Sequence, residues 1–592
     1  MAKRKRPAQP EARRAKNLPA GRRARSGQGD NQETLISLQL GALPIINRVI
    51  QRMRLHEFLT RHLPPEDNRT KLATPTVVLV LLKNLLISRE PMYGVAEWAS
   101  NYAPWLLGLQ QESLKHLHDD RVGRCLDRVF AALDSNLILD IVRHVVGEFD
   151  VRLDELHNDS TTITFFGDHA DAASEQRRLG RKTPAITWGH NKDHRPDLKQ
   201  LLYILTVSDD GGIPVYFQAA SGNTTDDQTH QATWQVLSEL VGNADFVYVA
   251  DCKLATMENM THIAGRGGRF VTVLPATRKE NAEFRQRLVD KPQTIRWRDV
   301  YHLTDEEGEL LDAFRVCLDE HVSQEGSRLL WFHSHRKVET DAATRARQLQ
   351  RAIGELTDLR ERLQGPRTRF RQHEKVVAAV DAILDARGVR EFLRVQITQH
   401  EQETFRQAKP GRPSATTQYR REVTTRFDVS WEIDGGQLDQ ASRGDGVFPL
   451  VTNVRDWEAA QVLQAYKRQP VIEKRFSQLK TDFRVAPVYL QSVTRIVGLL
   501  AVYFLALMVQ SLLERELRKA MESAGVESLP LYPEGRPCVR PTTRQVLDAF
   551  QPLSLHKLLR TGKSPRFFHS ELAPLHRQLL KLLRIPATAF GP

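Results

Sequence analysis

The first part of the chain, from about residue 34 to 148, carries apolar residues at the spacing of helices. Thr74-Pro75 is typical of a helix start, with Thr as the cap and Pro as the first helical residue. Helical spacing continues at Val122, Leu126, Val129, Phe130 and Leu133. Strand-like runs are scarce here, so we predict an all-α domain at 34–148. Such a domain could grip DNA or serve as a scaffold, and no helix-turn-helix decides between the two.

The pattern changes after residue 149 to a succession of strands and helices. Apolar runs predict strands at 151–158, 201–207, 214–219, 245–250 and 270–274, and helices at about 227–241 and 256–263. Asp209-Asp-Gly-Gly212 joins the second and third strands and is typical of a hairpin turn. This order of elements is that of a ribonuclease H-like mixed sheet. We therefore predict an α/β fold with such a core, preceded by the all-α domain.

The pattern of apolar and polar residues changes again at 279–452. We predict that these residues form an insertion of strands and helices, which splits the core into 149–278 and 453–525. Its charged helical stretch, from about 340 to 363, has an apolar stripe between Leu349 and Leu363. That stripe is either a packed helix, which we favour, or a short oligomerisation coiled coil. After a break rich in proline, residues 526–592 predict a helical C-terminal segment.

The net charge of the chain indicates a polyanionic partner. The 592 residues contain 85 Lys and Arg against 72 Asp and Glu, a net charge of +13. Residues 1–33 hold many of the cations, almost no acids and little apolar surface, so we predict a disordered basic tail. The tail is either a solvated segment or a loose phosphate-binding arm, and both interpretations stay open.

The cysteines and the apolar runs indicate in which cellular compartment the protein works. The four cysteines form no C-x-x-C pair, which favours a reducing compartment and argues against a structural zinc site. The apolar runs 76–82 and 496–509 are shorter than the roughly 20 residues that span a bilayer. We interpret both as buried helices and expect a cytoplasmic protein without a membrane partner.

Three acidic residues, Asp159, Asp251 and Glu473, stand in contexts typical of metal ligands. Asp159 and Asp251 each close a strand-like run, and Glu473 lies on a late helix. Two carboxylates at strand ends and one on a helix suit two-metal phosphoryl transfer, and Mg²⁺ prefers such oxygen ligands. An Asp at a strand end is by itself more often a turn cap. Their joint placement in strand order is what favours a metal site.

The segment around Glu473 has a regular spacing. Tyr466, Glu473 and Lys480 are seven residues apart, so on one straight helix they would share a stripe. Pro470 should instead start or kink a helix near Gln469. Tyr466 would then belong to the preceding helix, and Glu473 to a first turn whose positive end favours a carboxylate. A solvated helix face is the structural alternative.

Further polar residues flank the three acids and rank below them: His157, His190, Lys192, His194, Arg195, Asn223 and Asp226. Residues 190–195 lie in the loop before the second strand, where they either touch DNA or only cap and solvate the loop. Asn223 and Asp226 could hydrogen-bond to the acidic site from outside it. His157 faces the same side as Asp159 on an extended strand and could do the same.

At these residues the chain resembles DDE transposases of bacterial insertion sequences, in the group with the pattern Y-x2-R-x3-E-x6-K. Tyr466, Glu473 and Lys480 match it, and Gln469 stands in place of the Arg. Further blocks are similar to a subfamily that has a helical N-terminal domain: His157–Thr162, Gly189–Gln200, Gly222–His230 and Tyr248–Leu254. The similarity covers about residue 35 to the end, and several blocks in order are more specific than any one.

The resemblance implies metal-dependent cleavage at transposon ends and transfer of the 3′-hydroxyl into target DNA. It implies that Asp159, Asp251 and Glu473 are the catalytic residues and the ligands of Mg²⁺, with Mn²⁺ as a substitute. Its implied partners are transposon-end inverted-repeat DNA, target DNA and a second copy of the chain, in a homodimer or higher assembly.

The same resemblance implies that Tyr466 and Lys480 bind transposon-end DNA. Gln469 is the departure, because an amide cannot make the charged, forked phosphate contact of Arg. Arg468 and Arg475 are the nearby substitutes, although a shift of one residue turns a side chain about 100° around a helix.

We therefore expect an insertion-sequence transposase that associates with the nucleoid when bound to DNA. The alternative is a catalytically silent DNA-binding protein derived from such an enzyme, and the presence of all three carboxylates disfavours it. A nuclease of the same fold is a third interpretation, which leaves the long insertion and the basic tail without an obvious use.

Overall fold

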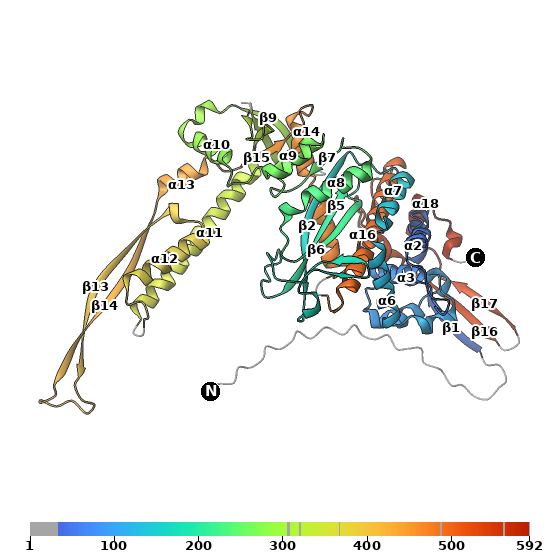
Figure 1. Ribbon diagram of the computed structural model, residues 1–592, viewed down its shortest axis with the longest axis horizontal. Coiled ribbons are helices and arrows are strands. Elements are labelled where there is room, and N and C mark those ends of the chain that lie inside the picture. The colour runs from blue at the N-terminus through green and yellow to red at the C-terminus, as the bar shows by residue number, and fades with distance from the viewer. Residues whose placement is uncertain are drawn as a thin grey trace.

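The computed structural model of the protein describes residues 33–304, 308–318, 321–365, 368–485, 488–560 and 563–590 (Figure 1). The predicted disordered tail, residues 1–33, lies outside the described residues except for Glu33, which begins the first strand. Three parts follow one another along the described chain: a helical N-terminal part, a large mixed sheet with its insertion, and a helical region with a C-terminal hairpin.

The N-terminal part is helical, as predicted. After strand β1 (Glu33–Gln39), its helices are α1 (Leu43–Arg52), α2 (Leu55–His62), α3 (Thr74–Ile87), α4 (Val95–Ser100), α5 (Pro104–Leu107), α6 (Asp119–Ala132) and α7 (Leu137–Phe149). Pro75 lies in the first turn of α3, and the cap position falls on Ala73 rather than Thr74. The Thr74 hydroxyl instead donates to Glu66 Oε1 at 2.6 Å, so the predicted cap is wrong by one residue.

A single ten-stranded sheet holds the predicted core. Nine of its strands lie side by side in the order β6 (Pro214–Ser221), β5 (Lys199–Ser208), β2 (Glu155–Phe165), β7 (Val247–Val249), β8 (Arg269–Val273), β15 (Val447–Thr452), β12 (Arg328–Ser334), β10 (Leu310–Cys317) and β9 (Trp297–Thr304). The tenth, β11 (His321–Val322), pairs with β12. Strand β2 runs antiparallel to β5 and parallel to β7, and β7 runs parallel to β8. These first five strands have the predicted ribonuclease H-like arrangement.

The two faces of this sheet bury different side chains. Leu156, Tyr248 and Phe270 join the main core, which also includes the N-terminal helices. Val247, Val249 and their neighbours form a second core with helix α14 (Ala459–Lys467). Alternate residues of β7 therefore face opposite cores, which fits a strand buried on both sides. Helices α8 (His230–Val241) and α9 (Met257–Gly265) pack against each other, and a small hairpin, β3 (Gln176–Arg178) and β4 (Arg181–Thr183), lies off the sheet.

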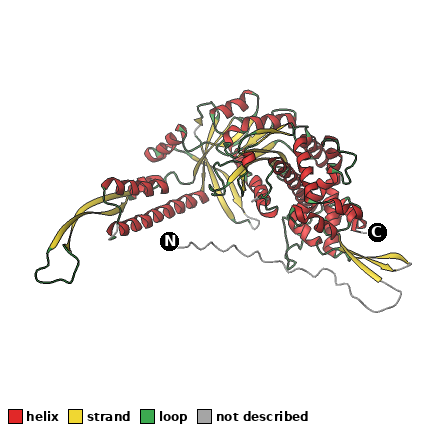
Figure 2. Ribbon diagram, turned by 60° about the horizontal axis from the view of Figure 1, so that its bottom comes forward, coloured by secondary structure: helices red, strands yellow, loops and turns green. Residues whose placement is uncertain are grey.

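Most strands of the insertion do not form a separate sheet. Its strands β9, β10 and β12 continue the core sheet, because β15 pairs with β8 on one side and β12 on the other. Its remaining elements are α10 (Lys279–Asp290), α11 (His335–Gln364), α12 (His373–Arg387), β13 (Leu393–Gln407), β14 (Tyr419–Ile433) and α13 (Gly435–Ser442). The apolar stripe of α11 is buried with α12 and the base of the β13–β14 hairpin. The packed-helix interpretation is therefore confirmed. Figures 1 and 2 show this part reaching away from the sheet.

Helix α16 (Val493–Ser523) lies at the junction of the N-terminal helices and the sheet, in contact with α3, α6 and β6. It is long and apolar enough to cross a membrane, so the prediction that its apolar run is too short is wrong. However, 94% of its most apolar window is buried inside the protein. The interpretation of this run as a buried core helix therefore holds.

The C-terminal region holds more than the predicted helices. It contains α17 (Thr543–Phe550), strands β16 (Ser554–Arg560) and β17 (Lys563–His569), and α18 (Pro574–Leu582). Strand β16 pairs with β1 along its whole length, from Glu33 with Arg560 to Gln39 with Ser554. Neither β1 nor β16 was predicted, and their pairing leaves no local signal because the two strands lie near opposite ends of the chain.

Gly498 sets the distance between α16 and α6. A Cβ atom added at Gly498 would lie 2.3 Å from the backbone oxygen of Leu126 on α6, whereas one added at Gly354 on α11 would have no atom within 4 Å. We expect Gly498→Ala to lower the unfolding free energy by about 1–3 kcal/mol through overpacking. Gly354→Ala, the matched control, should raise it by about 0.5–1 kcal/mol. Thermal unfolding midpoints check both, and equal midpoints would contradict the close contact.

Candidate active site

Strands β2 and β7 bring two of the predicted acids to the same level. Asp159 lies inside β2 rather than at its end, because the following Ser, Thr and Ile residues continue the strand to Phe165. Asp251 follows β7 by two residues, as predicted. His157 pairs with Val249 across the two parallel strands. Each Asp is two residues beyond one of these partners, so the two carboxylates stand on neighbouring strands at one position along the sheet.

The two carboxyl groups influence each other's ionisation. Burial raises the pKa of Asp159 to about 6, and the negative charges of Asp251 and Asp226 add to that rise. Burial also raises the pKa of Asp251, with the charge of Asp226 acting in the same direction. The three Asp side chains therefore make one negatively charged, partly dehydrated patch at the edge of β2 and β7.

Lys192 balances part of this charge. Its Nζ lies 3.0 Å from Asp226 Oδ2 and 3.5 Å from Asp159 Oδ1, and donates to the Ser160 backbone oxygen at 2.8 Å. The Ser160 hydroxyl donates to Asp226 Oδ1 at 2.5 Å. Burial acts to lower the pKa of Lys192, but Asp159 and Asp226 raise it overall. The sequence analysis ranked Lys192 and Asp226 below the three acids, and the structure places both beside Asp159.

Glu473 approaches the same region from helix α15 (Pro470–Ser477). It lies in the first turn of this helix, as expected from Pro470, and its side chain is exposed. Burial raises the pKa of Tyr466 to about 12, and the charges of Asp251, Cys252 and Glu473 contribute to the rise. Tyr466, the last aromatic residue of α14, therefore lies within electrostatic reach of both Asp251 and Glu473.

The donor types in this region fit a hard divalent cation, because all are carboxylate oxygens. Within the part of the chain that the structure describes, no three His, Cys, Asp or Glu side chains form a group that could hold a metal ion. Asp159 and Asp251 are thus brought together, whereas Glu473, which like Asp251 influences Tyr466, does not complete a ligand set with them among the described residues.

The predicted stripe of Tyr466, Glu473 and Lys480 on one helix is wrong. Tyr466 belongs to α14, Glu473 to α15, and Lys480 to a π-helical turn, Gln478–Asp482. The break at Pro470 and the extra residue per turn after Ser477 both change the angular positions of these side chains. Lys480 Nζ lies 2.6 Å from Asp193 Oδ1, next to Lys192 in the loop before β5.

A buried chain of polar contacts fixes the start of α15 against β2; we refer to Glu155, His157, Arg468 and Gln469 as the β2–α15 network. Gln469 Oε1 lies 3.0 Å from His157 Nδ1, and His157 Nε2 lies 2.8 Å from Glu155 Oε1. Arg468 Nε donates to Glu155 Oε1 at 2.7 Å, and its Nη2 donates to Oε2. The network ends two residues before Asp159, so it positions α15 relative to that acid.

Arg475 fixes the other side of α15, and its prediction as a DNA contact is wrong. Its side chain is buried, with 2% of the residue exposed. It donates to the backbone oxygen of Gly212 at 2.8 Å, in the β5–β6 turn, and to Glu514 Oε2 on α16 at 3.1 Å. Arg468 is also unsuited as a free substitute for the missing Arg, because both arms of its guanidinium fork bind Glu155.

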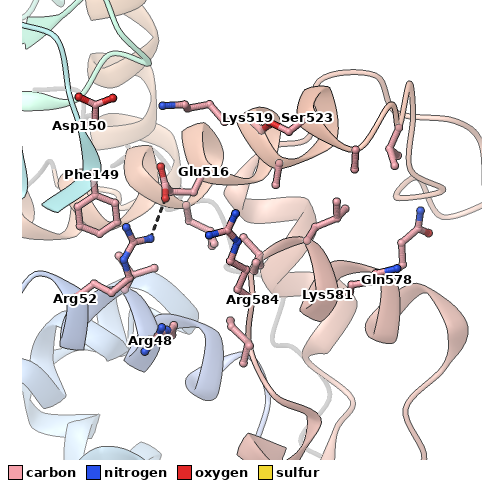
Figure 3. Close-up of a pocket in the computed structure, with 18 of the residues that line it drawn as sticks. Arg48, Arg52, Phe149, Asp150, Glu516, Lys519, Ser523, Gln578, Lys581 and Arg584 are labelled. Atoms are coloured by element: carbon pink, nitrogen blue, oxygen red, sulfur yellow. Dashed lines mark hydrogen bonds and ion pairs between the residues drawn. The ribbon is translucent and has the colours of Figure 1, made fainter.

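A cavity of about 820 Å³ lies between α1, α16 and α18 (Figure 3). It is lined by the cations Arg48, Arg52, Lys519, Lys581 and Arg584, and Arg52 is paired with Glu516 at 2.8 Å. None of its lining residues is one of the three acids.

The β2–α15 network makes stability depend on pH. Burial acts to raise the pKa of Glu155, but hydrogen bonds from Arg468 and His157 bring it to about 2. A lowered pKa stabilises the fold above about pH 4.5, the usual Glu value, and this contribution is lost as pH falls toward 2. We expect Glu155→Gln to lower the unfolding free energy by roughly 2–3 kcal/mol at pH 7.

This difference between wild type and Glu155→Gln should shrink as the pH approaches 3. Thermal midpoints measured from pH 3 to 8 check it, and Glu432→Gln, at an exposed glutamate near the end of β14, is the control. A difference that stays constant across this range would contradict the role given to the Glu155 charge.

Two family models match the chain. The Transposase DDE domain matches residues 154–509, which include Asp159, Asp251 and Glu473. A domain of unknown function, DUF4277, matches residues 36–143, the helical N-terminal part. No match was found among curated proteins.

Among solved structures, the chain is similar to a piggyBac transposase, determined by cryo-EM in a synaptic complex with hairpin DNA. The identity is 9% and the TM-score 0.34, over 86% of this chain and 78% of that one. So low a similarity adds nothing to the family match. Because the DDE model spans more than half of the 592 residues, the chain belongs to the transposases with a DDE domain.

Proposed function

We propose that this protein is an active insertion-sequence transposase, which cuts DNA at the transposon ends and joins the freed 3′-hydroxyl to target DNA. One observation carries the proposal. Asp159 and Asp251 lie at one level on the neighbouring strands β2 and β7, within the matched domain. Glu473 lies in the first turn of α15 and influences Tyr466 together with Asp251, and membership of the transposase family suggests a function for these carboxylates.

Asp159, Asp251 and Glu473 would hold the Mg²⁺ ions, and Mn²⁺ would substitute. When bound, the metal supplies activation of the attacking water or 3′-hydroxyl and stabilisation of the leaving oxygen. The contribution of the chain is to position the residues that would hold the metal. The β2–α15 network and Arg475 hold α15, and with it Glu473, from two sides.

DNA would meet this site through the groups around it. Tyr466 and Lys480 are proposed to bind the backbone of the transposon end. Lys480 can exchange its contact with Asp193 for a phosphate, because an ammonium binds either anion as a point charge. Gln469 is held by His157, so it positions α15 rather than contacting phosphate.

Two transposon ends must be joined in one reaction, so we propose a homodimer or a higher assembly on inverted-repeat DNA. The net charge of +13 supports a polyanionic partner. We place the reaction in the cytoplasm, on the nucleoid.

Cleavage and strand transfer on DNA carrying the ends that flank the gene test this function. Asp159→Asn, Asp251→Asn and Glu473→Gln should each lower both activities by about a thousandfold or more, because the metal's charge stabilisation is worth several kcal/mol. DNA binding should remain. Glu522→Gln, at an exposed glutamate on α16, is the control and should act as wild type.

Other results of this assay would favour a different function. A wild type that binds the ends and never cuts would make the protein a silent, transposase-derived DNA-binding protein. Cutting without strand transfer would make it a nuclease. Full activity in one of the three variants would remove that residue from the ligand set.

A further inference from the structure

The β13–β14 hairpin forms a long arm that only its base supports. Each strand has 15 residues, and they pair without interruption from Leu393 with Ile433 to Gln407 with Tyr419. Fifteen residues of strand extend about 50 Å. Near the base, Val429 and Phe427 are buried against α11 and α12. Figures 1 and 2 show the far end reaching beyond these helices, away from the sheet.

Charge is segregated along this arm. The distal part, residues 405–421, contains five cations and no Asp or Glu: Arg406, Lys409, Arg412, Arg420 and Arg421. The proximal parts, 393–404 and 422–433, contain two Arg and five acids. A strongly basic end on an otherwise acidic arm fits a polyanion that meets the arm at its tip.

The tip presents cations to solvent. Lys409 and Arg412 are exposed, and neither has an ion-pair partner among the described residues. Farther down, Arg421 pairs with Glu403 and Arg406 lies 3.4 Å from Glu422. Together with the exposed Arg420, which has no ion-pair partner among the described residues either, these two cations at the end of the arm are available to a ligand.

The tip of the arm combines basic residues with residues that take up little space. It reads Lys409-Pro-Gly-Arg-Pro413. The two prolines have no backbone N–H to satisfy, and the glycine has no side chain, so the backbone can come close to a surface. The minor groove of DNA is about 6 Å wide, and its narrow A·T-rich stretches attract inserted Arg side chains.

We propose that the tip of this arm inserts into the minor groove of A·T-rich duplex DNA. Arg412 lies on the floor of the groove, and Lys409, Arg406 and Arg420 contact the flanking phosphates. This inference rests on the proposed function only for its partner, DNA. It adds a contact far along the chain from the carboxylates, with a preference for base composition.

The arm also has an apolar strip, which a second copy of the chain would cover. Phe405, Tyr419 and Val423 lie on one face of the hairpin and are 64%, 55% and 48% exposed. Pairing two identical tips would bring five cations of each copy together, and like charges directly opposite are destabilising. The charge therefore favours DNA, and self-association becomes an outcome of the test.

Binding of the full-length protein to labelled duplexes of about 30 base pairs, in EDTA so that no cleavage occurs, tests the proposal. Three duplexes are compared, with A·T, G·C or inosine·cytosine pairs at the centre. An inosine·cytosine pair resembles A·T in the minor groove and G·C in the major groove, because it lacks the guanine 2-amino group. We expect it to bind as tightly as A·T, and G·C about tenfold more weakly.

Lys409→Ala with Arg412→Ala should weaken A·T binding about tenfold and abolish the preference. Arg412→Lys keeps the charge and should lose most of the preference, because Lys does not replace Arg in a narrow groove. Arg347→Ala with Arg351→Ala, on the exposed face of α11, removes the same charge and is the matched control. It should leave the preference unchanged.

Equal losses in the two double variants would overturn the proposal in favour of a general charge effect, and so would inosine·cytosine binding like G·C. An unchanged preference in the tip variants would overturn it as well. If Phe405→Ser with Tyr419→Ser abolished dimers in sedimentation while DNA binding stayed intact, the arm would be a self-association surface. If the tip variants keep the A·T preference while the protein still cleaves DNA, only this proposal is overturned and the proposed function stands. If the protein does not cleave DNA, the binding assay can still be done, because it is run in EDTA.

Discussion

The placement of helix α15 depends on ionic contacts made inside the protein. Glu155 is buried at the start of β2, the strand that carries Asp159, and a carboxylate in that position is costly unless it is paired. Arg468 supplies the charge, and His157 links the same carboxylate to Gln469 at the start of α15. Removing one member leaves a charge or a polar atom without a partner in the core. The geometry of the site is thus tied to the stability of the fold.

This coupling explains how an unusual residue can stand in the family's pattern. An Arg at position 469 would carry a second positive charge beside Arg468, next to a single Glu155. Gln469 is neutral and can accept from His157 and donate to the backbone of Asn158. In this chain residue 469 therefore links α15 to β2, whereas the Arg of the family's pattern is expected to contact DNA.

Much of the fold could be predicted from the sequence, because strands with local partners leave a local pattern. The β5–β6 hairpin, β7 and α9 were predicted from apolar runs and turn residues. The continuation of β2 beyond Asp159 was missed because its residues there are polar Ser and Thr. Of the site, the three acids could be named, but Arg475 could not be recognised as buried. Its partner Glu514 lies 39 residues away on α16, and no local spacing reveals such a pair.

The pairing of β1 with β16 has a consequence for how the protein is made. Ser37 and His556, which face each other across these strands, are 519 residues apart in the chain. The first strand therefore leaves the ribosome long before its partner exists, with Leu35 and Ile36 on an open edge. A product truncated before residue 554 would leave β1 without β16 on either edge and would be more prone to aggregate than the complete chain.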